Sequence, residues 1–162
     1  MFREMRRKNQ ALSEKETIDI LNNSTSGVLA VSGDHDYPYA VPLSYAYREG
    51  MLYFHCAKTG HKIDSIKRND KVSFCVIGSD EVVAEKFTTL YRSAVVFGRA
   101  RILTDDAERR HALNCLLEKY SPGFISDGEV EIENDWERLC VVEIRVEHLT
   151  GKAAKELIDY EA

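Results

Sequence analysis

Residues 52–62, with the sequence LYFHCAKTGHK, have the most informative spacing of chemically active residues in this chain. An alternating apolar stretch runs into a corner of small residues, and Gly60, His61 and Lys62 follow at the expected start of a helix. Backbone N–H groups at a helix N-terminus, together with a lysine ammonium group, favour phosphate binding. The segment therefore predicts a phosphate-binding corner. The spacing alone slightly favours an exposed helix start with solvated lysines, since two lysines near a glycine are common. The segment is not a P-loop, which needs a second glycine.

Two neighbouring groups could belong to the same site. His55 ends the apolar stretch, where it could face a ligand or serve as a hydrogen-bonded structural residue. In residues 39–45, small, apolar and aromatic side chains surround Pro42, so a flat aromatic ligand could lie against this backbone. An edge strand packed on the core gives the same pattern.

Other candidates carry weaker signals. Ser93 lacks the flanking glycines of a nucleophilic serine, and the histidines show no zinc-ligand spacing, so we expect no metal site. Arg99 and Arg101 alternate on one strand and could meet a phosphate or only solvent. Residues 126–135 are acidic without clear periodicity and predict a mobile loop. Trp136 after them could cover a pocket or anchor that loop.

The elements that must position these residues follow from the apolar pattern. Ser13 and Glu16 form a capping-box pattern for a first helix ending near Asn23. Further helices are expected at 60–69, from Thr104 and Asp105 to Pro122, and after residue 152. Strands are expected at 27–32, 37–47, 51–55, 71–77, 90–103 and 139–146.

The order of these elements predicts the fold class. Residues 48–50 are a hairpin signal, Pro38 and Pro42 predict an edge or irregular strand, and Gly98 predicts a bulge. Strands that arrive as hairpins, with helices inserted between them, favour a mainly β fold. We expect an antiparallel barrel or sheet with peripheral helices.

Bulk composition limits the function classes. The 162 residues fit a single domain spanning 1–162, and 22 basic against 27 acidic side chains give a net charge of −5. This balance argues against a nucleic-acid or anionic-membrane partner. No apolar run approaches the roughly 20 residues of a membrane helix, and the basic start is not followed by a secretory apolar region. Four scattered cysteines without a Cys-x-x-Cys pair suit a reducing compartment, so we expect a cytoplasmic protein.

Residues 37–45 (YPYAVPLSY) and 52–62 together resemble the FMN-binding split-barrel proteins related to pyridoxamine 5'-phosphate oxidase. Within that family the chain is most similar to the nitroimidazole-resistance (Nim-type) branch. Residues 5–8, 91–98 and 149–152 add weaker matches, whereas Asn9 departs from the pattern, in which an acidic residue often follows the basic cluster. The resemblance implies a six-stranded antiparallel split β-barrel that forms a homodimer, with FMN at the interface between the subunits.

The same resemblance assigns cofactor-binding positions. They are Val41, Pro42 and Leu43 along the isoalloxazine ring, His55, Cys56 and Ala57 on the ribityl side, Gly60, His61 and Lys62 at the phosphate, and Ser93 on the long strand. His55 also matches the Nim-type histidine that has a role toward a bound small molecule, which makes it the candidate catalytic residue.

The function implied is that of an FMN-dependent oxidoreductase. It would reduce a small-molecule acceptor, such as a nitroaromatic or nitroimidazole compound, with electrons from NADH or NADPH. No dinucleotide fingerprint is visible, which leaves open a non-catalytic protein that binds or stores flavin or haem. Pyridoxamine-phosphate oxidase itself is disfavoured, because the chain is short and shows no second phosphate site.

Overall fold

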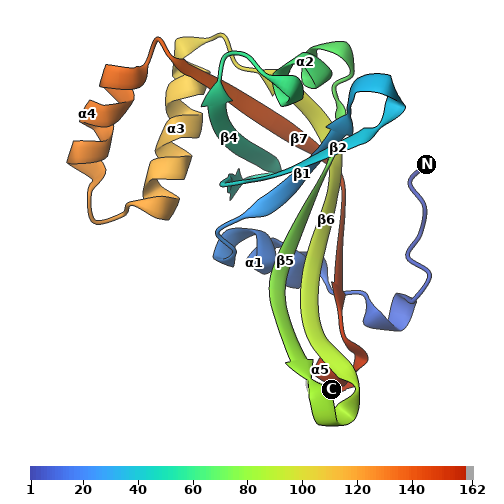
Figure 1. Cartoon of the computed structure of the whole chain (residues 1–162). Coiled ribbons are helices and arrows are strands. Elements are labelled where there is room, and N and C mark those ends of the chain that lie inside the picture. Colours follow the sequence, from blue (N-terminus) through green and yellow to red (C-terminus); the bar gives the residue numbers. More distant parts are fainter. Residues whose placement is uncertain (160–162) are drawn as a thin grey trace.

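A strongly curved, seven-stranded antiparallel sheet forms the body of the protein in a computed structural model that describes residues 1–159 (Figure 1). Its strands are β1 (Gly27–Ser32), β2 (Pro38–Leu43), β3 (Ala46–Arg48), β4 (Met51–Ala57), β5 (Lys71–Val83), β6 (Thr88–Ile102) and β7 (Leu139–Ala153). The helices are α1 (Glu14–Asn23), α2 (His61–Arg68), α3 (Asp106–Tyr120), α4 (Ile125–Asp135) and α5 (Lys155–Asp159). Short 3-10 turns lie at Lys8–Gln10, Asp34–Asp36 and Ala84–Lys86. No helix within residues 1–159 is long and apolar enough to cross a membrane.

The strand order makes the sheet a split barrel. The order is β2-β1-β5-β6-β7-β4-β3, so β2 and β3 form opposite edges although only Ser44 and Tyr45 separate them. Three peptide steps span about 11 Å at most, which forces the two edges to approach each other there. The predicted mainly β split barrel is therefore confirmed, with seven strands in place of six.

Tyr45 explains the additional strand. Its side chain is fully buried, and its hydroxyl donates a hydrogen bond of 2.7 Å to the Leu21 carbonyl in α1. Its N–H donates to the Tyr120 hydroxyl of α3 at 2.9 Å. Because these bonds replace ladder bonds, the single strand predicted over 37–47 is divided into β2 and β3.

Two apolar clusters fill the structure. The barrel interior contains the larger cluster, in which Phe54, Phe74 and Ile144 are fully buried, and α1 closes one end with Ile20 and Leu21. The predicted capping box is present at its start, where Ser13 and Glu16 exchange hydrogen bonds. A second cluster lies outside the barrel, between α3 and the strands β3, β4 and β7.

Several local predictions are confirmed, whereas β5 and β7 extend at least six residues beyond their predicted ends. β2 is an edge strand, β3 and β4 form the predicted hairpin, and the β6–β7 register shifts at Gly98. β5 continues six residues past the predicted end at Ile77, and β7 runs on to Ala153. The β5 and β6 extensions form an arm that projects well beyond the barrel (Figure 1).

The acidic segment 126–135 was predicted to be a mobile loop, and this prediction is wrong because the segment forms helix α4. Ile132 is buried against α3, and Gly128 packs so closely that a Cβ there would lie 2.1 Å from a Leu117 methyl. Ile125, Gly128 and Ile132 follow a helical spacing, which the surrounding acidic residues obscure. Asp127, Glu129 and Glu133 are exposed to solvent.

Candidate functional site

The corner between β4 and α2 leaves a helix N-terminus open. Gly60 is the N-cap, with φ of 131°, and no side chain caps the helix. Its carbonyl accepts hydrogen bonds from the N–H groups of Ile63 and Asp64, and a Cβ at Gly60 would meet nothing within 4 Å. Positive φ at this position requires glycine. The first N–H groups of α2 therefore face open space, as an anion site requires.

Two lysines flank this opening. Lys62 is partly buried in the first turn of α2, whereas Lys58 is exposed in the loop before it. Neither forms an ion pair within residues 1–159. Lys62 is also close enough to Cys56 to act on its thiol electrostatically. Because Lys62 is partly buried and has no carboxylate partner among the described residues, it is available to an anionic ligand and is less freely solvated than Lys58.

The His61 side chain is directed to the neighbouring turn. Its ring stacks on Tyr39 of β2, with ring centroids 4.0 Å apart, and its Nε2 accepts a hydrogen bond of 3.3 Å from the Asp34 N–H. Asp34 in turn pairs with Arg68 at 2.8 Å, and that hydrogen bond lowers the pKa of the Asp34 carboxyl. His61 therefore fastens α2 to the β1–β2 turn, and its backbone N–H remains for a ligand.

β2 presents a free edge beside this corner. The N–H of Gly33 donates a hydrogen bond to the Tyr37 carbonyl. In an antiparallel ladder, hydrogen-bonded pairs alternate with non-hydrogen-bonded pairs. The hydrogen-bonded pairs of β1 and β2 are therefore Val31–Tyr39, Leu29–Val41 and Gly27–Leu43. The backbone groups of Ala40 and Pro42 therefore point away from β1. Val41 and Leu43 turn their side chains to the core and support this edge from within.

The end of β4 forms a second open edge. β3 pairs with β4 only as far as Tyr53, so residues 55–57 have β7 on one side and no strand on the other. Cys56 packs against the barrel core, and Ala57 is exposed. His55 points to the opposite face, toward α3 and α4.

His55 lines a cavity of about 230 Å³ between β4, α3 and α4. The apolar lining includes Leu113, Leu116 and Ile132, whereas Glu131 and Asp135 supply carboxylates. Burial lowers the pKa of His55, and the Asp135 charge opposes this shift. The lowered pKa favours the neutral ring, which can donate one hydrogen bond and accept one.

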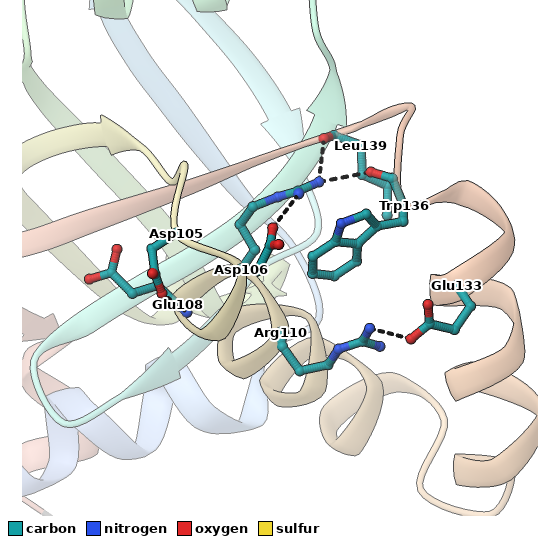
Figure 2. Close-up of polar contacts among 8 residues, drawn as sticks. Asp105, Asp106, Glu108, Arg110, Glu133, Trp136 and Leu139 are labelled. Carbon is teal, nitrogen blue, oxygen red and sulfur yellow. Dashed lines mark hydrogen bonds and ion pairs between the residues drawn. The ribbon is translucent and has the colours of Figure 1, made fainter.

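The α3–α4 pair that closes this cavity is held by cations around Trp136. The guanidinium groups of Arg109 and Arg110 lie 4.1 and 4.5 Å from the Trp136 ring. Figure 2 shows Arg110 reaching across to Glu133 of α4, with Trp136 beside them. Arg109 also donates to the Trp136 carbonyl at 2.8 Å. Trp136 thus anchors the segment that follows α4, the second of its two predicted roles.

Ser93 is the predicted site residue that the fold does not bring to the corner. It lies on the outer face of β6, six residues from Arg99, where β6 passes the end of α2. Six strand residues span about 20 Å. Arg99 and Arg101 are engaged elsewhere, Arg99 with Asp70 and Glu147, and Arg101 with Glu108 and Glu143.

Sequence reasoning missed the contacts that orient the corner. Tyr39, Asp34 and Arg68 fix α2 against β1 and β2, and none of them carries a recognisable spacing. The α4 residues facing His55 were also missed, although the spacing of Ile125, Gly128 and Ile132 could have found that helix.

A model of the family described as pyridoxamine 5'-phosphate oxidase matches residues 13–153. The chain belongs to this family. The match includes both edges and the α2 corner, and it confirms the family resemblance seen in residues 37–62. No match to a curated protein was found.

Several solved structures share the fold of this chain. An FAD-binding protein from Mesorhizobium loti is 30% identical over 90% of this chain and 97% of its own, with a TM-score of 0.63. A candidate 5-nitroimidazole antibiotic resistance protein from Bacteroides thetaiotaomicron is 22% identical, with a TM-score of 0.71 over 88% of this chain and 86% of its own. An FAD and haem binding protein from Mycobacterium smegmatis is 19% identical, with a TM-score of 0.75 over 96% and 81%.

Proposed function

We propose that this chain binds FMN and acts as an oxidoreductase toward a small acceptor. The observation that carries the proposal is the open N-terminus of α2 with Lys62 beside it. The stack of His61 on Tyr39 holds this helix start next to the free edge of β2. The family supports a flavin, and the FAD-binding relative at 30% identity supports it further. We favour FMN over FAD because this corner offers one phosphate position.

The residues present fit this cofactor. The N–H groups of Gly60, His61 and Lys62, with the Lys62 ammonium group, would hold the phosphate. The open edge at residues 55–57 would take the ribityl chain, and residues 41–43 would lie along the ring. When bound, a flavin supplies hydride and electron transfer, while the protein orients it and tunes its environment.

His55 would act on the acceptor side. Its neutral ring can donate a hydrogen bond to a nitro or carbonyl oxygen without introducing a charge. The apolar surface formed by α3 and α4 would exclude water around a small aromatic acceptor. NADH or NADPH is the proposed donor.

The proposal includes a homodimer. On the outer face of β1, β5 and β6, side chains including Val28, Cys75, Ser93 and Val95 are each partly exposed, with no helix among residues 1–159 packed over them. Phe97 on this face is 40% exposed. A second copy that covered this face would bring its own Ser93 toward the corner, which Ser93 cannot reach within one chain.

The spectrum of the purified protein tests cofactor binding. We expect flavin absorbance as purified or after FMN is added to the apoprotein. A colourless protein that gains no bound FMN would disprove the proposal.

A binding or storage protein for flavin or haem is the second candidate, since a structural relative binds FAD and haem. Anaerobic stopped-flow mixing with NADH and NADPH separates the two candidates. A catalyst should bleach the bound flavin rapidly, whereas a storage protein should not.

A further inference from the structure

Cys56 and Cys140 are the only two cysteines within residues 1–159 that face each other. They are direct partners in the antiparallel β4–β7 ladder, and both are free thiols. Directly opposed residues in such a ladder have Cα atoms about 4.5–5.5 Å apart, within the range of about 4.4–6.8 Å seen in disulfides. Two thiols held in register on one face are arranged to form a bond.

The surroundings of this pair differ from those of a buried structural cysteine. The Cys56 thiol hydrogen-bonds to Cys140, and this bond, aided by Lys67, Arg109 and Lys58, lowers the pKa of Cys140. The same hydrogen bond raises the pKa of Cys56. One thiolate is therefore stabilised beside a thiol, in a positively charged environment.

The pair is also accessible to small molecules. Only the Ala57–Leu139 pair lies between it and the end of the ladder, and β3 does not cover β4 at this level. Cys56 is partly exposed, whereas Cys140 is 6% exposed. Strand ends open locally at little cost, so fraying of one pair would expose both sulfur atoms.

We propose that Cys56 and Cys140 form a reversible cross-strand disulfide, which makes the β4 end a redox-modified site. A small disulfide such as glutathione disulfide is the oxidant. A thiolate of the pair attacks one of its sulfur atoms and releases a glutathione thiolate. The remaining thiol, after losing its proton, attacks the mixed disulfide and releases the second glutathione. Two electrons leave the protein, two protons leave its thiols, and two glutathione molecules form.

Cys75 and Cys115 provide internal controls. Cys75 lies opposite Val28 and Val95, and Cys115 lies in α3 near His111. Burial raises the pKa of both thiols. Neither faces another cysteine, so neither should form an internal disulfide.

To test the proposal, the full chain is equilibrated in glutathione buffers, quenched with acid and alkylated. Mass spectrometry then counts the free thiols. Increasing glutathione disulfide should remove two of the four alkylatable thiols, and peptide mapping should link Cys56 to Cys140. The double variant Cys75→Ser/Cys115→Ser should lose both of its thiols in the same buffers. Cys56→Ser should show no internal link. Because wild-type mapping decides the result, a variant that folds poorly does not obscure it.

Four alkylatable thiols across all buffers, mixed disulfides without an internal link, or a link to Cys75 or Cys115 would each overturn the proposal. The readout requires no cofactor, so it is independent of the proposed flavin function.

Discussion

The ring of His61 lies against the ring of Tyr39, with 4.0 Å between centroids and 28° between planes. This stack joins the first residue of α2 to the edge strand β2, which have no direct connection in the sequence. Two surfaces proposed to bind different ends of one ligand are therefore held in a fixed relation. Replacing the stack should move one surface relative to the other.

Tyr39→Ala should reduce FMN affinity although the Tyr39 side chain is assigned no contact with the cofactor. Loss of an aromatic pair costs about 0.5–1.5 kcal/mol beyond area burial, so we expect a Kd that is weaker by roughly 2-fold to 13-fold if the whole cost appears in binding. Fluorescence titration measures it. Tyr37→Ala is the matched control, because Tyr37 is 75% exposed. Equal Kd values for the two variants would show that the stack does not position the site.

Lys62→Ala should weaken FMN binding more than Lys58→Ala. Lys62 lies in the first turn of α2 and is partly buried, whereas Lys58 is solvated. A charge-assisted hydrogen bond contributes about 1.5–3 kcal/mol, so a loss of roughly 10-fold to 100-fold is expected at Lys62. Isothermal titration calorimetry of both apoproteins compares them directly. Equal losses would mean that the phosphate is bound elsewhere.

Much of the fold was readable from local patterns because the decisive signals were local. Ser13 and Glu16 predicted the start of α1, Pro38 and Pro42 predicted the edge strand, and Gly98 predicted the bulge. The break at Tyr45 depends on hydrogen bonds to Leu21 and Tyr120, which lie far away in the sequence. No local pattern could reveal it.

The candidate site also contains some residues that local sequence patterns identified and others that they could not identify. Gly60 and Lys62 were identified because helix N-termini have a local signature. The partners that orient them, Asp34 and Tyr39, come from another hairpin and become neighbours only after folding. Helix α4 was missed for a different reason, since its acidic solvent face outweighed three correctly spaced small and apolar residues.

Gly98→Ala should destabilise the barrel strongly. A Cβ there would lie 2.3 Å from the Arg145 carbonyl oxygen, which belongs to the facing strand and cannot rotate away. We expect a loss of roughly 2 kcal/mol or more in the free energy of unfolding, as for other overpacked sites. Urea denaturation measures the change. Gly123→Ala is the control, with nothing within 4 Å of its Cβ, and a similar loss there would remove the steric explanation.

Lys119 should make stability depend on pH. Its ammonium group lies 3.9 Å from the Tyr45 ring centroid and 3.2 Å from the Leu21 carbonyl oxygen, and burial lowers its pKa to about 8. Between pH 8 and the ordinary lysine pKa of about 10.4, the unfolded chain binds more protons than the folded chain. The contribution of Lys119 to stability therefore rises with pH in this window, by at most about 1.4 kcal/mol per pH unit, whereas the buried thiols of Cys75 and Cys115 contribute an opposite slope.

Lys119→Met should lack this contribution while keeping most of the apolar stem. Urea unfolding from pH 7 to pH 9.5 should show the wild-type free energy rising relative to that of the variant. The window ends below pH 10, where tyrosines in the unfolded chain begin to ionise and Tyr45 adds an opposite slope, since burial raises its pKa. Parallel curves for the two proteins would show that Lys119 is not desolvated.

Ile132→Ser should detach helix α4 from α3. The variant therefore tests whether residues 126–135 form an ordered helix, as in the structure, or the mobile loop that their acidic composition indicated. Ile132 is 9% exposed against α3, whereas Val130 on the same helix is 60% exposed. Burying a hydroxyl without a partner and losing a large apolar contact costs about 2–5 kcal/mol, more than a surface helix can retain. Glu-C proteolysis, followed by mass spectrometry, should therefore cleave at Glu129, Glu131 and Glu133 at least tenfold faster.

Val130→Ser is the control and should leave the wild-type rate nearly unchanged, because the Val130 side chain contributes little buried area. If both variants were cleaved at the wild-type rate, the α3 contact would not be what holds α4, and His55 would face a less enclosed cavity.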